Sequence, residues 1–120
     1  MFSCKREHNI PVAGTITSGT WSISKYIDSG TDETNHFTGY TFNFNSDGSL
    51  VAITNGNGVV GNWSEYNDDD HTELNILFSQ NPLDELNDDW HVLSRSDIKI
   101  ELEDVSGGNG EVDYLTFSKQ

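Results

Sequence analysis

Apolar and polar residues alternate along most of the chain. The clearest case is residues 40–45, where aromatic side chains occupy every second position. Residues 73–79 and 98–103 repeat the pattern with leucine, isoleucine and phenylalanine. A period of two places alternate side chains on one face of an extended chain. These segments therefore predict β-strands that bury one face.

Glycine, asparagine and aspartate separate the alternating segments. Residues 46–48 and 55–58 combine these residue types at the length of a tight hairpin turn. Such turns need a left-handed backbone, which glycine and asparagine tolerate best. The predicted strands are residues 21–28, 40–45, 50–54, 59–66, 73–79, 89–94, 98–103 and 112–118.

Two segments depart from the strand pattern. Residues 29–36 are a polar connection without strand character. Residues 81–87 predict a short helix, because Asn81 can cap it, Pro82 fits its first position, and acidic residues follow in the first turn. We expect this helix to cover one end of the sheet.

Short strands joined mostly by tight turns indicate an up-and-down antiparallel topology. Closing such a sheet removes edges that would otherwise favour aggregation. The predicted fold is all-β: an eight-stranded up-and-down antiparallel barrel with one short helix. Its interior is either filled by side chains or holds one small ligand. The side chains expected inside are Trp21, Ile23, Tyr40, Phe42, Phe44, Leu50, Ala52, Trp63, Leu74, Ile76, Phe78, Trp90, Val92, Ile98, Ile100, Leu102, Leu115 and Phe117.

The length of 120 residues is that of one domain. The pattern predicts a flexible leader at residues 1–18 and the barrel domain at 19–120. Cys4 follows an apolar and a small residue, which resembles the end of a bacterial lipoprotein signal. Two interpretations stay open: a lipid anchor at Cys4, with the domain in the bacterial cell envelope or secreted, or a free thiol near a frayed terminus. A single cysteine excludes an internal disulfide.

Acidic residues dominate the charge, with 20 Asp and Glu against 6 Lys and Arg and a formal net charge of −14. Such a surface repels phosphate backbones and anionic lipid headgroups. Nucleic-acid binding is therefore not expected, and membrane contact is expected only through an anchor at Cys4. Self-repulsion and a closed sheet favour a monomer.

Candidate chemistry is sparse. The acidic turns at residues 68–73 and 84–89 could offer oxygen ligands to Ca²⁺, but neither has the spacing or the glycine of a calcium-binding loop. We interpret both as solvated turns. His36, His71 and His91 occur singly, without a downstream cysteine pair. We therefore predict no metal and no cofactor.

No nucleophile elbow or phosphate-binding glycine loop is present, so no catalytic residue is predicted and an enzyme is not expected. A hydrolase that uses paired carboxylates at the barrel mouth is kept as a third hypothesis, because such a pair is recognised by distance and not by spacing.

Gly19, Thr20 and Trp21 at the start of the first strand resemble the lipocalin signature, in which the tryptophan packs across the closed end of the barrel. The chain as a whole resembles the bacterial lipocalin-like domain family, through residues 40–48, 61–63 and 114–119 in that order. The resemblance extends roughly from residue 19 to residue 119.

The resemblance implies a small or half-open barrel, often on secreted or lipid-anchored proteins and usually without known enzymatic activity. It also implies that Trp21 closes the barrel. Lipocalins typically place an arginine of the last strand over this tryptophan, whereas here the last strand offers only Lys119.

Two functional hypotheses follow. In the first, the domain is a non-catalytic binding module, and Tyr40, Phe42, Trp63, Phe78 and Trp90 line a small apolar cavity for a hydrophobic ligand. In the second, the same rings fill the core, and the domain is a surface-exposed structural or protein-interaction domain without a ligand.

Overall fold

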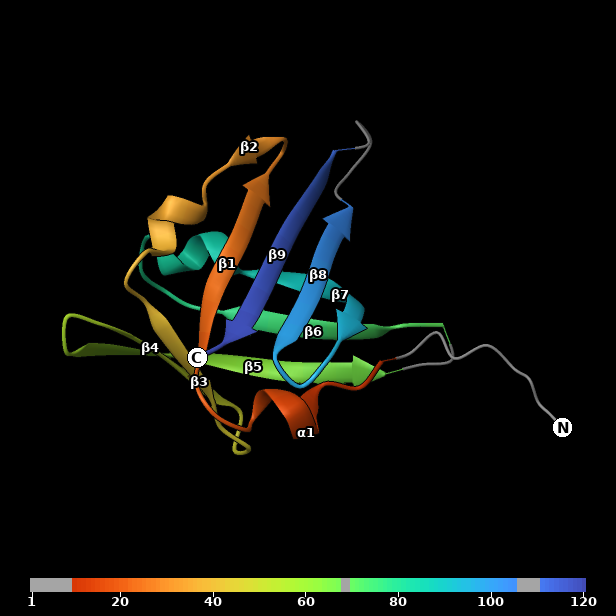
Figure 1. The fold of residues 1–120 in the computed structure, drawn as a ribbon, viewed down its shortest axis with the longest axis horizontal. Helices are drawn as coiled ribbons and strands as arrows, with labels where there is room; N and C mark the ends of the chain where they lie inside the picture. Colours follow the sequence, from red (N-terminus) through yellow and green to blue (C-terminus); the bar gives the residue numbers. More distant parts are fainter. Residues whose placement is uncertain (1–9, 68–69, 106–110) are drawn as a thin grey trace, which may run out of the picture.

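The computed structural model describes residues 10–67, 70–105 and 111–120 and shows a closed antiparallel barrel (Figure 1). The strands follow one another around the sheet in the order β1, β3, β4, β5, β6, β7, β8 and β9, and β9 pairs back with β1. The short β2 pairs with the far end of β1. The elements in chain order are α1 (Ala13–Ile16), β1 (Trp21–Asp28), β2 (Thr31–Asp32), η1 (Thr34–Phe37), β3 (Thr41–Phe44), β4 (Ser49–Thr54), β5 (Asn57–Asn67), β6 (Thr72–Leu77), η2 (Leu83–Leu86), β7 (Asp88–Arg95), β8 (Lys99–Val105) and β9 (Val112–Lys119).

The predicted eight-stranded up-and-down barrel is confirmed. Figure 1 shows β1, β9 and β8 crossing in front of the more horizontal β5 and β6, so the barrel is formed by strands that cross at a large angle. None of the helices in the described residues has the length and apolar character needed to cross a membrane. Residues 106–110, between the last two predicted strands, and residues 68–69 of the predicted acidic turn lie outside the described residues.

The tight hairpin between β4 and β5 follows from its two turn residues. Thr54 pairs with Asn57, so Asn55 and Gly56 form a two-residue turn. Their φ values of 52° and 79° lie in the left-handed region that such a turn requires. The turn sets the register of the hairpin, which places Leu50 opposite Gly61 and Ala52 opposite Val59.

The predicted interior is largely correct. Sixteen of the eighteen expected side chains are buried and Tyr40 is partly buried, whereas Ile98 is 65% exposed. The prediction for Ile98 is wrong because β8 begins one residue later, at Lys99, and Ile98 belongs to the preceding turn. The alternating pattern therefore extended one position beyond the strand.

The leader predicted at residues 1–18 is wrong for the part that the structure describes. Val12 and Ile16 are fully buried. Val12 directly precedes the short helix α1, and Ile16 is the last residue of that helix. The carboxylate of Glu65 accepts hydrogen bonds from the backbone N–H groups of Val12 and Ala13. The indole N–H of Trp21 donates to the carbonyl oxygen of Ile16 at 2.9 Å. This segment thus covers one end of the barrel.

The helix predicted at residues 81–87 is present as a single 3₁₀ turn, η2. Pro82 precedes the turn, and no side chain caps its backbone. Leu83 and Leu86 are both buried. In a 3₁₀ helix, residues three apart lie on one face, so a single turn is sufficient to place both leucines inside.

The polar connection at residues 29–36 contains structure that its composition did not predict. Ser29 and Gly30 have positive φ values of 50° and 87°, and they turn the chain into β2. Asp32 pairs with Ile27 of β1. The 3₁₀ helix η1 then places Phe37 in the core, where its side chain is 2% exposed.

Candidate functional site

The residues predicted to line a ligand cavity lie in the core. Phe42 is fully buried, and Trp63, Phe78 and Trp90 have exposed fractions of 8%, 2% and 1%. Tyr40 is partly buried and packs against the same core. The five residues come from different strands or the segments beside them, and the closed sheet directs them toward one interior.

Aromatic rings contact one another in series through this interior. The ring centroids of Phe42 and Phe117 are 5.5 Å apart, and those of Phe117 and Phe44 are 5.3 Å apart. Phe44 in turn lies 5.8 Å from Trp63. All three pairs are edge-to-face, an arrangement that adds stability beyond the burial of apolar area.

The polar atoms of the buried tryptophans already have partners. The indole N–H of Trp63 donates to the carbonyl of Asn45, and that of Trp90 donates to the carbonyl of Leu86, both at 2.9 Å. In the part of the chain that the structure describes, every buried side-chain nitrogen or oxygen atom has a hydrogen-bond partner. These groups connect the barrel wall to the β3–β4 turn and to η2.

The second glycine-x-tryptophan unit, at residues 61–63, has a packing role. A Cβ atom on Gly61 would lie 2.6 Å from the ring of Phe78 and would collide with the carbonyl oxygen of Leu77. Only glycine therefore allows Phe78 and the end of β6 to pack this closely against β5. Trp63, two residues later, points into the same core.

The first such unit, at residues 19–21, packs against the last strand. Lys119 Nζ lies 5.6 Å from the ring centroid of Trp21. Gly19 has a φ of 89°, and a Cβ atom there would lie 2.8 Å from the Lys119 side chain. A cation of the last strand thus lies over the first-strand tryptophan, with lysine where the lipocalin resemblance implies arginine.

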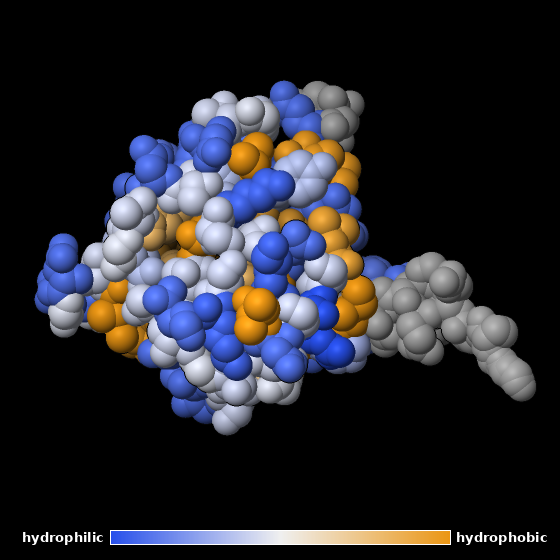
Figure 2. All heavy atoms as spheres, in the orientation of Figure 1, coloured by the Kyte–Doolittle hydropathy of each residue, from blue (hydrophilic) through white to orange (hydrophobic). Residues whose placement is uncertain are grey.

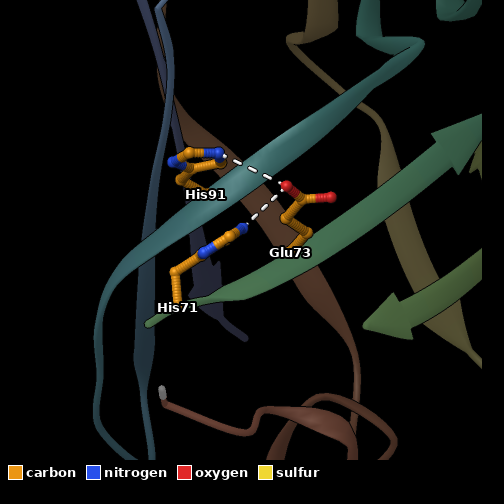
Figure 3. A group of neighbouring side chains, drawn as sticks. All are labelled: His71, Glu73 and His91. Carbon is orange, nitrogen blue, oxygen red and sulfur yellow. Dashed lines mark hydrogen bonds and ion pairs between the residues drawn. The ribbon is translucent and has the colours of Figure 1, made fainter. Parts of the chain in front are cut away.

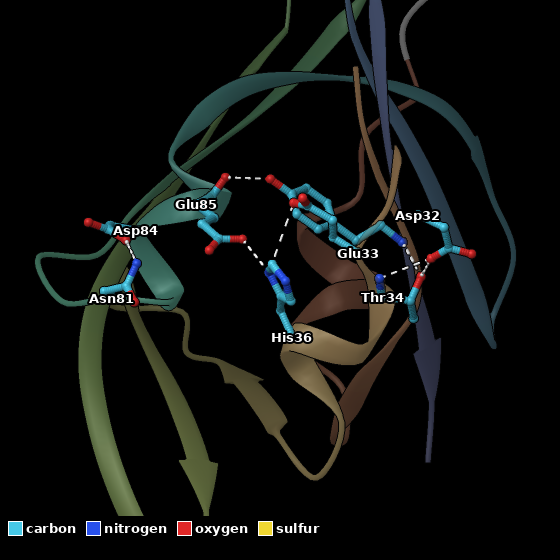
Figure 4. A network of polar contacts seen from close by, with 8 residues as sticks. Asp32, Glu33, Thr34, His36, Asn81, Asp84 and Glu85 are labelled. Atoms are coloured by element: carbon cyan, nitrogen blue, oxygen red, sulfur yellow. Dashed lines mark hydrogen bonds and ion pairs between the residues drawn. The ribbon is translucent and has the colours of Figure 1, made fainter. Parts of the chain in front are cut away.

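Figure 4 shows a polar network that joins η1 to η2. His36 Nδ1 lies 2.8 Å from Glu85 Oε1 and 3.9 Å from Glu33 Oε1. The hydroxyl of Tyr26 donates to the backbone carbonyl of Glu85 at 3.0 Å. The hydrogen bond to Glu85 raises the pKa of His36, and burial together with nearby carboxylates raises the pKa of Tyr26.

Three carboxylates, one each from β7, β8 and β9, lie close together. Asp88, Asp104 and Asp113 each offer an oxygen within 4.8 Å of the others. Burial, followed by the hydrogen bond with Asp104, raises the pKa of Asp88 to about 6. Burial also raises the pKa of Asp113, which accepts a hydrogen bond from the backbone N–H of Ser29.

The acidic turn predicted at residues 84–89 is not one cluster. Asp84 contacts Asn81, Glu85 contacts His36, and Asp89 accepts from Asn75 on the next strand. The side chain of Asp88 makes a hydrogen bond with Asp104 of β8. The four acids therefore have four different partners.

His71, Glu73 and His91 form a compact group on the outer side of the barrel (Figure 3). His71 Nε2 lies 2.8 Å and His91 Nε2 lies 3.5 Å from the same oxygen, Glu73 Oε2. The two imidazole rings lie side by side with centroids 4.6 Å apart. The prediction that these two histidines occur singly is wrong. Two imidazoles and a carboxylate are ligands suited to zinc and related metals.

The register of β6 and β7 is what sequence reasoning missed. Glu73 lies directly opposite His91, and His71 precedes Glu73 by two residues and therefore shares its face. The i, i+2 spacing of His71 and Glu73 was visible in the sequence. The position of His91 depended on the pairing across the 3₁₀ turn, which the sequence does not encode as a simple period.

The fold and these groups define a small closed β-barrel domain with a packed aromatic interior. No known protein family matches the sequence, and no curated protein is significantly similar to it. A solved structure, the crystal structure of a DUF4847 family protein from Bacteroides vulgatus, is similar with a TM-score of 0.62. The match covers 92% of this chain and 98% of that chain at 16% sequence identity. The TM-score shows a shared fold, and at this identity the likeness shows the fold alone.

Proposed function

We propose that the chain is a non-catalytic, lipocalin-like barrel domain of a bacterial cell-envelope protein, with a filled interior, that acts through its outer surface as a structural or protein-interaction domain. The observation that carries the proposal is the burial of Phe42, Trp63, Phe78 and Trp90 in one continuous core. These are the rings that would have to line a cavity if the domain carried a ligand.

Buried side chains of the short segments beside the strands support a filled interior. Val12 and Ile16 of the α1 segment are buried at one end, and Leu83 and Leu86 of η2 are buried elsewhere along the rim. Phe37 of η1 is buried beside Tyr26, with ring centroids 5.5 Å apart. A ligand would have to displace such side chains, and protein interiors resist this because they are packed as densely as organic crystals.

The outer surface supports a role outside the barrel. Figure 2 shows apolar residues in several separate places between polar and charged residues on the face that it draws. The net charge of −14 opposes binding to nucleic acid and to anionic membranes. We propose a monomer, because self-repulsion of this size opposes association of like chains.

A non-catalytic role is supported by where the described ionisable groups lie. His36, His71 and His91 are partly exposed, with their carboxylate partners beside them. The core cluster consists of hydrophobic residues. Among the described residues, the buried polar side chains are those of Thr72 and Thr116, so no carboxylate is buried in the interior.

A ligand-free interior can be tested with protein isolated gently from its own host. Native mass spectrometry of wild-type protein is expected to show the mass of the chain alone. Titration with benzene, followed by NMR, is expected to show no saturable binding. A retained lipid-sized mass would overturn the filled-interior proposal and favour the ligand-carrying alternative.

A cavity variant is the matched control for this titration. Phe117→Ala removes a ring that contacts both Phe42 and Phe44. Dry apolar cavities created in this way bind benzene, so the variant is expected to show saturable binding where the wild type does not. Leu74→Ala, a smaller truncation at a fully buried position, serves the same purpose if Phe117→Ala does not fold.

The envelope location rests on the resemblance of the residues around Cys4 to the end of a lipoprotein signal, and Cys4 lies outside the described residues. Mass spectrometry of the N-terminal peptide from host-derived protein tests it. An acylglyceryl group on Cys4 is expected, whereas an unmodified thiol would contradict the anchor. This outcome is independent of the ligand experiment.

A further inference from the structure

We propose that His71, Glu73 and His91 bind one divalent transition-metal ion of the zinc class on the outer face of β6 and β7. The inference does not depend on the proposed function of the barrel, because the three side chains lie outside its core (Figure 3).

The fold places the three side chains on one face. Thr72 and Leu74 are fully buried, so His71 and Glu73, which alternate with them, point outward. Trp90 and Val92 are buried on β7 in the same way, and they leave His91 outward between them. Pairing of Glu73 with His91 then brings the two strands' outward side chains together.

The distances suit a metal centre. All three ligand atoms lie within 4.8 Å of one another. Tetrahedral zinc with bonds of about 2.0–2.1 Å holds its ligand atoms about 3.3 Å apart. The distances from Glu73 Oε2 to His71 Nε2 and His91 Nε2, 2.8 and 3.5 Å, lie on either side of that value. Small side-chain rotations are therefore enough to admit the ion.

The rings are already oriented for binding. The two imidazoles lie side by side, tilted by 33°, and Figure 3 shows a nitrogen of each directed toward the Glu73 carboxylate. Both ligand nitrogens are Nε2, which leaves each Nδ1 to carry the proton of a neutral imidazole. The arrangement presents two lone pairs and one carboxylate oxygen to a single point.

The ligand set selects the class of metal. Two imidazoles with one carboxylate favour zinc, copper, nickel and cobalt, whereas Ca²⁺ and Mg²⁺ favour sites made of oxygen. The side chains of His71, Glu73 and His91 have exposed fractions of 31%, 26% and 46%. Solvent thus reaches the group, and water supplies the remaining coordination position.

Surrounding charge favours a cation at this place. Glu103 of β8 lies opposite His91, and Asp89 precedes His91 by two residues on the same outward face. The whole chain carries a net charge of −14. A negative potential of this kind raises the local concentration of cations and accelerates their association.

Metal titration of the full chain tests the proposal. Protein stripped with a chelator is titrated with Zn²⁺ by calorimetry and with Co²⁺ by visible absorption. We expect one ion per chain, cobalt bands typical of tetrahedral coordination, and weaker binding of Ca²⁺. Zn²⁺ at about 100 times its Kd is expected to raise Tm by about 10 °C. Failure of the wild type to bind Zn²⁺, or equal binding of Ca²⁺, would overturn the site.

Three variants locate the ion. His91→Ala and Glu73→Gln are each expected to weaken Zn²⁺ binding by more than about 100-fold, beyond the effect typical of outer-shell changes. His36→Ala is the matched control, because His36 is similarly exposed, at 38%, and contacts Glu85 at a different place. It is expected to keep wild-type affinity. Loss of binding in His36→Ala with retention in His91→Ala would reject the assignment.

The variants are interpretable because their positions are partly exposed. Each is expected to keep the wild-type Tm in the presence of chelator, since surface substitutions usually have small effects on stability. If a variant does not fold, the wild-type protein alone still tests the site. Its Tm is then compared in the presence of Zn²⁺ and in the presence of chelator. No increase in that Tm would contradict the proposal.

Discussion

The two sides of β1 are held in different ways. Along β9, the paired positions run from Trp21 opposite Lys119 to Ile27 opposite Tyr114. Along β3, the pairing consists of Trp21 opposite Phe42. Figure 1 shows the consequence, since β1 runs beside β9 for its whole length and diverges from β3. On one side, β1 therefore closes the barrel through backbone pairing with β9. On the other side, the pairing with β3 is confined to one position, and side chains and short elements hold the wall.

Side chains and short elements complete the weakly paired side. The backbone N–H of Tyr26 donates to Thr34 Oγ1 at 2.9 Å, and the N–H of Glu33 donates to the Tyr26 carbonyl at 2.8 Å. Phe37 then packs edge-to-face against Tyr26 and Tyr40. A closed barrel thus does not require a complete ladder, provided that the freed backbone groups find partners and apolar side chains cover the gap.

Truncation of the buried ring on the weakly paired side is the strongest test of this comparison. Phe37→Ala is expected to lower the free energy of unfolding by about 3–5 kcal/mol, because it leaves a cavity where no ladder supports the wall. Chemical denaturation measures the change.

A variant that removes one hydrogen bond between β1 and β9 gives the comparison on the ladder side. Ser24→Ala removes the exposed hydrogen bond between the hydroxyls of Ser24 and Ser118. It is expected to change the free energy of unfolding by less than about 0.5 kcal/mol. Equal losses for both variants would show that the two sides do not differ in the way proposed.

A smaller effect is expected from the hydrogen bond between β1 and η2. Tyr26→Phe removes the hydroxyl that donates to the Glu85 carbonyl, and it is expected to cost about 1 kcal/mol of unfolding free energy. Tyr66→Phe is the control, because Tyr66 is 58% exposed. A loss in the control as large as that in Tyr26→Phe would contradict a role for this bond.

Beyond β9, the weak point is electrostatic, because β7, β8 and β9 bring Asp88, Asp104 and Asp113 close together. The folded-state pKa of Asp88 is raised to about 6, so the folded state binds more protons than the unfolded state between about pH 4 and 6. Stability from this group is present at low pH and is lost as pH rises through 6. Asp88→Asn is therefore expected to stabilise the protein at pH 7 by about 0.5–1 kcal/mol, since solvent screens a partly exposed group.

The pH dependence checks that prediction. The difference in Tm between Asp88→Asn and wild type is expected to disappear below about pH 4, where the unfolded carboxyl is also protonated. A stabilising effect that persists at pH 3 would point to packing and not to charge.

The smallest effect is expected at His36, on the weakly paired side. The hydrogen bond to Glu85 raises its pKa, so this contact stabilises the folded state at pH values below the unfolded pKa of histidine. The stabilisation is lost as pH rises through the folded pKa. His36→Gln is expected to lower Tm slightly at pH 6 and to have no effect at pH 9, as measured by thermal unfolding. An equal loss at both pH values would exclude the charge-assisted bond as its cause.

Much of the fold could be predicted because strand formation and burial depend on local periodicity. The alternation in residues 40–45 predicted β3 and its buried face, and Asn55 with Gly56 predicted a hairpin turn. Trp21 was expected inside and is fully buried. Each of these follows from a few neighbouring residues and the geometry of one strand or turn.

Tertiary structure decided the parts that have no period. Ile16 lies in a four-residue helix and Phe37 follows a polar run, so neither has enough neighbours of its own to predict burial. The meeting of His71 and His91 depends on strand register across a 3₁₀ turn, and the filling of the interior depends on the summed volumes of rings from many strands. Periodicity assigns a side chain to a face, but only the closed packing of all strands determines what it contacts there.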